Sequence, residues 1–144
     1  MATQLRVSIV GTKGLKRALD KMNPGVNKRI VRESLIESAF LVQRDAAKNQ
    51  ILAGGGGKKS GMTKPHPRFL TSRTGTLRRS IKVDRGPLPF AIEVGTDLVY
   101  GAAHEFGSTK RNLPVRAFMQ PALERVAPKF GEIVVKHWKR EAGL

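Results

Sequence analysis

The stretch from Pro24 to Leu52, PGVNKRIVRESLIESAFLVQRDAAKNQIL, decides the fold because it carries a long and regular apolar pattern. Its small and apolar side chains recur at helical spacing, at Val31, Leu35, Ser38, Ala39, Val42 and Ala46. This spacing places them on one face of an α-helix. Asn23 is a good cap for such a helix, and Pro24 suits its first position. We therefore predict a long helix from Pro24 to about Leu52.

Two shorter elements are expected before this helix. Leu5, Val7 and Ile9 alternate with polar residues, a period of two that is typical of a half-buried strand. Residues 14–22 place apolar side chains on one helical face, and Asn-Pro-Gly at 23–25 ends that pattern. We expect a strand and a short helix here.

A glycine-rich and basic stretch follows the long helix. Residues 53–73 include four consecutive glycines and show no apolar period, so we predict a flexible loop within the domain. No acidic residue occurs between Asp45 and Asp84, although that interval contains nine lysines and arginines. The candidate contacts to DNA or to an acidic partner are Lys58, Lys59, Lys64, Arg68 and Arg73.

The middle of the chain predicts a small antiparallel hairpin. Residues 74–81, TGTLRRSI, are expected to form a helical turn capped by Thr74 or Thr76 and to lead into a strand around Ile81 and Val83. After a turn at 84–87, Phe90, Ile92 and Val94 alternate with other residues up to Gly95. The two runs are expected to pair with each other.

The last third of the chain is expected to be mainly helical. Residues 100–106 suit a short helix, and residues 108–112 suit a basic polar loop. From Phe118 to Arg140, apolar residues recur mostly at spacings of three and four. Pro121 fits the first turn of this helix, whereas Pro128 is expected to bend or interrupt it.

These elements fit one domain over residues 1–144, since a chain of this size rarely has material for a second core. The predicted class is α+β: a small antiparallel sheet packed against a long helix in the N-terminal half and a C-terminal helix. Cysteine is absent, which excludes disulfides and thiolate metal sites. No stretch is typical of a signal peptide or a membrane span. We therefore expect that the protein is made in the cytoplasm and that it has no membrane partner.

The charge of the chain indicates an anionic partner. Lysine and arginine number 27 against 11 acidic residues, which gives a formal net charge of +16. Such a field attracts nucleic acid or an acidic protein, although a solvated surface without a partner is also consistent with it.

Catalysis and cofactor binding find no support in the sequence. The three histidines, His66, His104 and His137, lie in unrelated elements and do not form a metal-ligand set. The glycine-rich stretch departs from a P-loop, because Lys59 follows Lys58 where serine or threonine is required. We therefore expect neither an enzyme nor a cofactor. Trp138 is interpreted as a core or interface anchor rather than a platform for bases.

Three blocks match the motifs of a known family. Residues 74–81 resemble T-G-x-L-R-x-S-I, and Val94-Gly95 with YGAAHEFGS at 100–108 resembles V-G followed by Y-A-x-x-x-E-F-G-T. PVRAFMQPAL at 114–123 resembles P-x-R-P-F-x-x-P-A-L. The family is that of the tail-completion, or head–tail joining, proteins in the neck of long-tailed bacteriophages, also called phage morphogenesis or minor tail proteins. The motif and assembly positions are Gly75, Leu77, Arg78, Ser80, Gly95, Tyr100, Glu105, Phe106, Gly107, Pro114, Arg116, Phe118 and Pro121.

The motif residues also have a physical interpretation of their own. Gly75, Gly95 and Gly107 are expected at turns, and Glu105 is expected to pair with a nearby basic residue. Tyr100 and Phe106 supply apolar surface, and alanine at Phe106 or Phe118 should destabilise the fold if the ring is fully buried. The chain departs from the family at three positions, namely Gly101 for alanine, Ser108 for threonine and Ala117 for proline.

The resemblance implies a structural protein of the virion, assembled in the host cytoplasm. Such a protein forms a homo-oligomeric, hexameric ring between the tail tube and the head connector, around the DNA passage. Its expected neighbours are a tail terminator or tail tube protein on one side and a head connector, adaptor or stopper protein on the other. The alternative, which rests on net charge alone, is a non-specific nucleic-acid-binding protein.

Overall fold

The computed structural model describes residues 5–10, 24–53, 70–72, 74–86 and 90–143. Within these residues the chain is α+β, as predicted, with a three-stranded antiparallel sheet and a short parallel strand pair beside the helices. None of the described helices is both long and apolar enough to cross a lipid bilayer. The expected helix at 14–22, the Asn23 cap and most of the glycine-rich stretch lie outside these residues. So do all five basic candidates for contact with DNA or an acidic partner, Lys58, Lys59, Lys64, Arg68 and Arg73.

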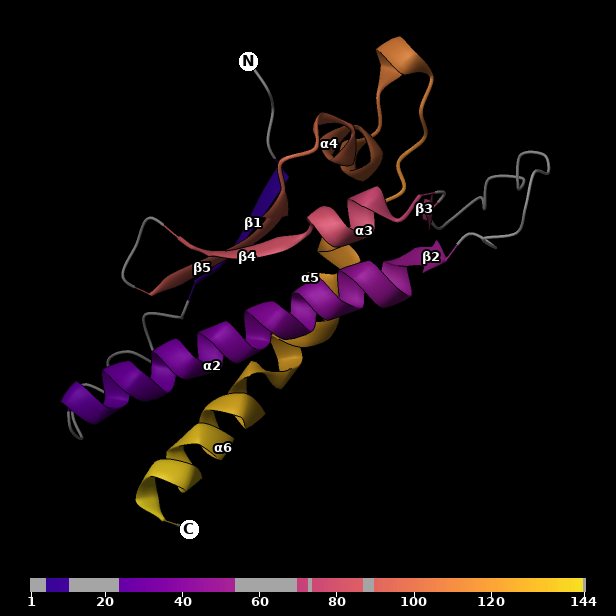
Figure 1. Ribbon diagram of the computed structural model, residues 1–144. Helices are drawn as coiled ribbons and strands as arrows, with labels where there is room; N and C mark the ends of the chain where they lie inside the picture. Colours follow the sequence, from indigo (N-terminus) through magenta and orange to yellow (C-terminus); the bar gives the residue numbers. More distant parts are fainter. Residues whose placement is uncertain (1–4, 11–23, 54–69, 73, 87–89, 144) are drawn as a thin grey trace.

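Helix α2 (Pro24–Asp45) is the element on which the others pack. Its predicted apolar stripe is confirmed, because every member from Val31 to Ala46 is at most 7% exposed. Ser34 and Ser38 lie on the same buried face, and each hydroxyl donates to the carbonyl four residues earlier at 2.7 Å. The sheet lies along one side of α2 and the C-terminal helix along the other (Figure 1).

The end of the long helix differs from the prediction. Helix α2 stops at Asp45, a π-helical turn η1 (Ala46–Gln50) follows, and Ile51–Ala53 forms strand β2. Strand β2 pairs in parallel with β3 (Leu70–Ser72), so both ends of the predicted flexible loop are strands. Ile51 is completely buried. Its apolar side chain continues the helical period, which is why the pattern alone did not reveal the change to extended backbone.

The sheet has the order β1-β5-β4, with both pairings antiparallel. Strand β5 (Ala91–Thr96) lies between β1 (Leu5–Val10) and β4 (Lys82–Arg85), which confirms the predicted hairpin and the first strand. The expected turn at Gly95 is wrong, because Gly95 lies inside β5 opposite Arg6 and Lys82. The strand continues to Thr96, whose buried side chain has hydrogen-bonding partners described below.

The interruption expected at Pro128 is confirmed. Helix α5 (Met119–Val126) is followed by a 3-10 turn η3 (Ala127–Lys129) and then by α6 (Phe130–Ala142). Proline lacks the backbone donor that a continuous helix needs. The two helices differ in their contacts. Helix α5 contributes Met119, Ala122 and Val126 to the core shared with β5, whereas α6 packs chiefly on α2, away from the sheet (Figure 1).

Candidate assembly site

Glu105 anchors the start of helix α5. It lies near the end of helix α4 (Val99–Phe106) and is only 5% exposed. Its carboxylate accepts three backbone N–H bonds, from Phe118 at 2.8 Å, Met119 at 3.0 Å and Gln120 at 2.9 Å. The next residue, Pro121, has no N–H group. A single side chain therefore satisfies every donor that the first turn of α5 leaves without an intrahelical partner.

This geometry corrects the expectation that Glu105 pairs with a basic residue. The carboxylate is held instead by backbone donors at the N-terminus of α5. A second bond joins the same two segments, because the Arg116 backbone N–H donates to the His104 carbonyl at 2.8 Å. The motif blocks at 100–108 and 114–123 are therefore one connected unit in space.

Gly101 brings the third motif block into this unit. A Cβ placed on Gly101 would lie 2.7 Å from Thr96 Cγ2, 3.5 Å from Leu77 Cδ1 and 3.9 Å from Phe118 Cζ. Leu77, in the short helix α3 (Thr76–Ser80), is 7% exposed, and Phe118 is completely buried. We call the set Leu77, Ser80, Thr96, Gly101, Glu105 and Phe118 the motif junction.

Ser80 and Thr96 close the motif junction with hydroxyl groups. Their side-chain oxygens are 2.6 Å apart, and Ser80 Oγ also donates to the Leu77 carbonyl at 2.8 Å. Thr96 Oγ1 in turn accepts the Leu98 backbone N–H at 3.2 Å, at the start of α4. A hydrogen bond of 2.6 Å from Gln43 Nε2 to the Ile81 carbonyl ties this region to α2. The two hydrogen bonds of Ser80 explain why a serine precedes Ile81 in the first motif.

Two motif glycines occupy positions that favour glycine. Gly75 (φ 76°) precedes α3 and Gly107 (φ 77°) follows α4, both in the region that side chains rarely adopt. The expected threonine cap on α3 is shifted by one residue, because Gly75 occupies the N-cap position and Thr74, just before it, accepts the Thr76 backbone N–H on Oγ1 at 3.4 Å. Thr74 Oγ1 also contacts Thr76 Oγ1 at 2.8 Å. Of the remaining motif residues, Arg78 is half-buried and Pro114 is exposed, outside the motif junction.

Phe106 is not part of the motif junction and is 69% exposed. The condition of full burial, on which the expected loss from alanine rested, is therefore met by Phe118 and not by Phe106. Val99, seven residues earlier on the same face of α4, is 52% exposed, Tyr100 is 38% exposed and Val115 is 60% exposed. We call these four residues the apolar rim. Beside it lies an open pocket of about 670 Å³, lined by residues 106–110 and 112–115.

His104 and Arg116 are both partly buried and are joined by the backbone hydrogen bond described above. Burial lowers the pKa of the His104 imidazole below its usual 6.5, and the positive charge of Arg116 lowers it further. The Tyr100 ring meets the imidazole edge-on, with centroids 6.3 Å apart. The lowered pKa favours the neutral form of the imidazole.

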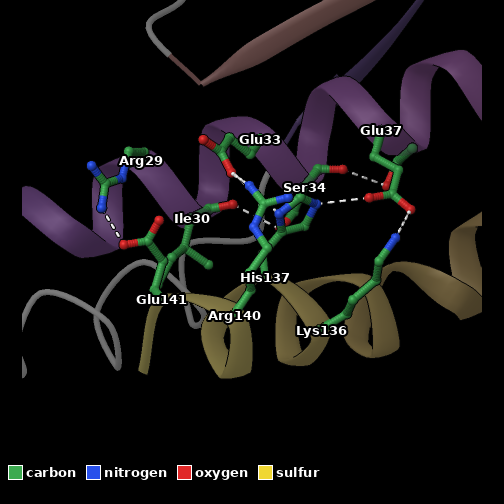
Figure 2. Close-up of polar contacts among 10 residues, drawn as sticks. Arg29, Ile30, Glu33, Ser34, Glu37, Lys136, His137, Arg140 and Glu141 are labelled. Atoms are coloured by element: carbon green, nitrogen blue, oxygen red, sulfur yellow. Dashed lines mark hydrogen bonds and ion pairs between the residues drawn. The ribbon is translucent and has the colours of Figure 1, made fainter. Parts of the chain in front are cut away.

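A second polar region joins helices α2 and α6 (Figure 2). Glu37 on α2 accepts from Lys136 Nζ at 2.7 Å and from His137 Nε2 at 2.8 Å. Glu33 lies 3.2 Å from His137 Nδ1 and accepts from Arg140 at 3.0 Å, and Arg29 pairs with Glu141. The order of the pairs shows that the two helices run antiparallel. We call this set of seven residues the charged seam.

The electrostatics of the charged seam favour the ionised form of Glu37. The hydrogen bond from Lys136 lowers the pKa of Glu37 below its usual 4.5, and His137 adds to this effect, while burial opposes it. His137 itself is buried between the two glutamates. Sequence reasoning excluded His137 from a metal-ligand set but did not identify its partners. The available signal was the four-residue spacing of Glu33 with Glu37 and of Lys136 with Arg140 on two long helices.

Neither region has the character of a metal site. Within the described ranges, no three His, Asp or Glu side chains are grouped so that they could hold a metal ion. The chemistry of the motif junction is that of packing and backbone capping. It fixes the relative positions of α3, α4, α5 and the sheet.

Comparisons with known proteins do not define a family. No protein-family model matches this chain, and no solved structure matches it either. A similar curated protein is an uncharacterized protein of the archaeon Methanocaldococcus jannaschii, 47% identical over 49 residues. That match covers 34% of this chain and 36% of the archaeal protein, so this chain corresponds to about a third of that relative's length.

Proposed function

We propose that this protein is a structural subunit of the head–tail junction of long-tailed bacteriophages, a tail-completion protein that forms a hexameric ring around the DNA passage. The observation that carries the proposal is the motif junction. Residues of all three family-like blocks, separated in sequence, meet at Gly101, Glu105 and Phe118. The three blocks therefore act as one packing unit, which supports reading them together as a single motif.

The apolar rim supports an assembly role. Phe106 belongs to the same motif as Glu105, yet it is 69% exposed while Glu105 is 5% exposed. A large exposed apolar side chain beside a rigid, buried motif is a common feature of association surfaces. We assign the apolar rim to contacts between copies of this chain in the ring. The tail terminator or tube and the head connector, adaptor or stopper would then occupy the two faces of the ring.

The experiment is electron microscopy of lysates from a phage or prophage whose copy of this gene has been deleted. Free, unjoined heads and tails are expected, and joined virions should return when the gene is supplied in trans. Normal virions without the gene would overturn the proposal. That result would leave non-specific nucleic-acid binding, which the net charge of +16 motivates, as the better assignment.

A further inference from the structure

A basic pocket lies between the end of α2 and the end of α5, apart from the motif junction and the charged seam. It has a volume of about 500 Å³. Its walls are residues of α2 and η1 on one side and of α5 and η3 on the other. The residues that line it are Leu41, Arg44, Asp45, Lys48, Arg125, Val126 and Lys129.

The charge of this pocket is strongly positive. Its lining includes four cations, and Asp45 is the one carboxylate among these residues. The Asp45 side chain is only 14% exposed and lies 3.6 Å from Arg125, so its charge is largely offset within the wall. Among the described residues, none forms an ion pair with Arg44, Lys48 or Lys129.

The spacing of the cations suits an extended anion. Arg44 and Lys48 are four residues apart on one wall, and Arg125 and Lys129 are four residues apart on the other. Each wall therefore presents two cations separated by roughly one helical turn of about 5–6 Å. An open pocket of about 500 Å³ is far larger than one phosphate group needs. Only two apolar side chains, Leu41 and Val126, contribute to the lining, which makes an apolar ligand a poor fit.

We infer that this basic pocket binds the phosphate backbone of duplex DNA without sequence preference. Cations on two facing walls contact successive phosphates, and the counterions released on binding supply the affinity. The site is distinct from the glycine-rich stretch to which sequence reasoning assigned DNA contact. The inference needs only the pocket and does not depend on a role at the head–tail junction.

A competing explanation is local stabilisation of the helices. All four cations lie in or just after the last turns of α2 and α5, where a positive charge interacts favourably with the helix dipole. The two explanations predict different results. Helix stabilisation affects thermal stability alone, whereas DNA binding affects affinity and its dependence on salt.

The test compares two triple variants of the full chain. The pocket variant is Arg44→Gln, Lys48→Gln and Lys129→Gln, and the control variant is Arg111→Gln, Lys28→Gln and Lys139→Gln. The three control residues are also exposed, and both variants lower the formal net charge from +16 to +13, because each loses three positive charges. Fluorescence anisotropy with a labelled 20-bp duplex measures the affinity over a series of salt concentrations.

The pocket variant should bind the duplex at least about tenfold more weakly than the wild type near 0.1 M salt. Its log–log salt slope should fall by about 2–3, since each lost phosphate contact contributes about 0.9. The control variant should retain most of the affinity and slope. Equal losses in the two variants, or a pocket variant that loses thermal stability but keeps its affinity, would overturn the inference.

Inorganic phosphate at constant ionic strength tests the other source of the same chemistry. It should displace little duplex, because a single phosphate engages only part of the pocket. If phosphate displaces the duplex from the wild type and not from the pocket variant, the pocket is a site for free phosphate and the assignment to DNA is wrong.

Discussion

The motif junction and the charged seam fasten the C-terminal helices by different chemistry. At the motif junction, one buried carboxylate accepts three backbone N–H bonds and the Phe118 ring is completely buried. In the charged seam, α6 is tied to α2 by side-chain ion pairs whose lysine and arginine partners are mostly exposed. Water and salt screen the second kind of contact but have little access to the first. The motif junction should therefore carry most of the stability.

The largest expected effect is that of Phe118→Ala. The completely buried ring leaves a cavity, so the free energy of unfolding should fall by about 3–5 kcal/mol in urea denaturation. The matched control is Phe106→Ala, which alters an exposed ring and should change the free energy by no more than about 0.5 kcal/mol. Similar losses in both variants would mean that the burial described for these rings is wrong.

Glu105→Gln should have the next largest effect. The amide keeps the shape of the side chain but turns one acceptor into a donor that faces a backbone N–H group. A loss of about 2–3 kcal/mol is expected, since bonds to charged groups are worth about that much. Glu124→Gln is the control, because Glu124 is exposed and accepts one side-chain bond from Gln120. Equal stability of the two variants would show that Glu105 does not anchor α5.

Gly101→Ala should destabilise the protein by about 1–2 kcal/mol, because its Cβ would approach Thr96 Cγ2 to 2.7 Å. Thr96→Ser removes that methyl group and keeps the hydroxyl that meets Ser80. In a double-mutant cycle, the loss caused by Gly101→Ala should shrink toward zero in the Thr96→Ser background. If Gly101→Ala lowers the free energy of unfolding equally in both backgrounds, the strain does not arise from the Thr96 methyl group. A loss that shrinks in the Thr96→Ser background would also explain why this chain has glycine where the family pattern has alanine.

Glu37→Gln should have the smallest effect, less than about 1 kcal/mol, because the charged seam is partly exposed. The pKa of Glu37 is lowered on folding, so its stabilisation is complete above the ordinary pKa of 4.5 and is lost as pH falls through the folded value. Wild type and variant should therefore converge in acid and in high salt. If the difference in unfolding free energy between wild type and Glu37→Gln persists at about 1 M salt, the charged seam stabilises the protein through packing rather than through charge.

The periodic parts of the fold could be predicted from sequence. The stripe of α2, the hairpin and the break at Pro128 all follow from spacing or from the missing donor of proline. The passage from α2 to β2 could not, because Ile51 continues the apolar period in either conformation. Gly95 was misplaced because a glycine at the end of an alternating run is as compatible with a central strand as with a turn.

The sequence identified most residues of the candidate site but not the contacts that they make. The motif named Glu105 and Phe106, yet the sequence carries no sign that one is buried and the other exposed. Whether Glu105 pairs with a cation or with backbone donors depends on a contact with Phe118, which lies 13 residues later in the sequence. Such a contact cannot be read from the motif alone. Thr96 was missed for the same reason, because it lies outside the motif blocks and its partner Ser80 is 16 residues earlier in the sequence.

One comparison of two exposed phenylalanines tests the central claim most directly. Phe106, on the apolar rim, is 69% exposed, and Phe40, on α2, is 54% exposed, so serine at either position should leave the fold intact. Each variant is supplied in trans to the phage that lacks the gene, and the fraction of joined virions is counted by electron microscopy. The proposed function predicts unjoined heads and tails with Phe106→Ser and normal virions with Phe40→Ser. Normal virions with both variants would contradict the assignment of the apolar rim to assembly.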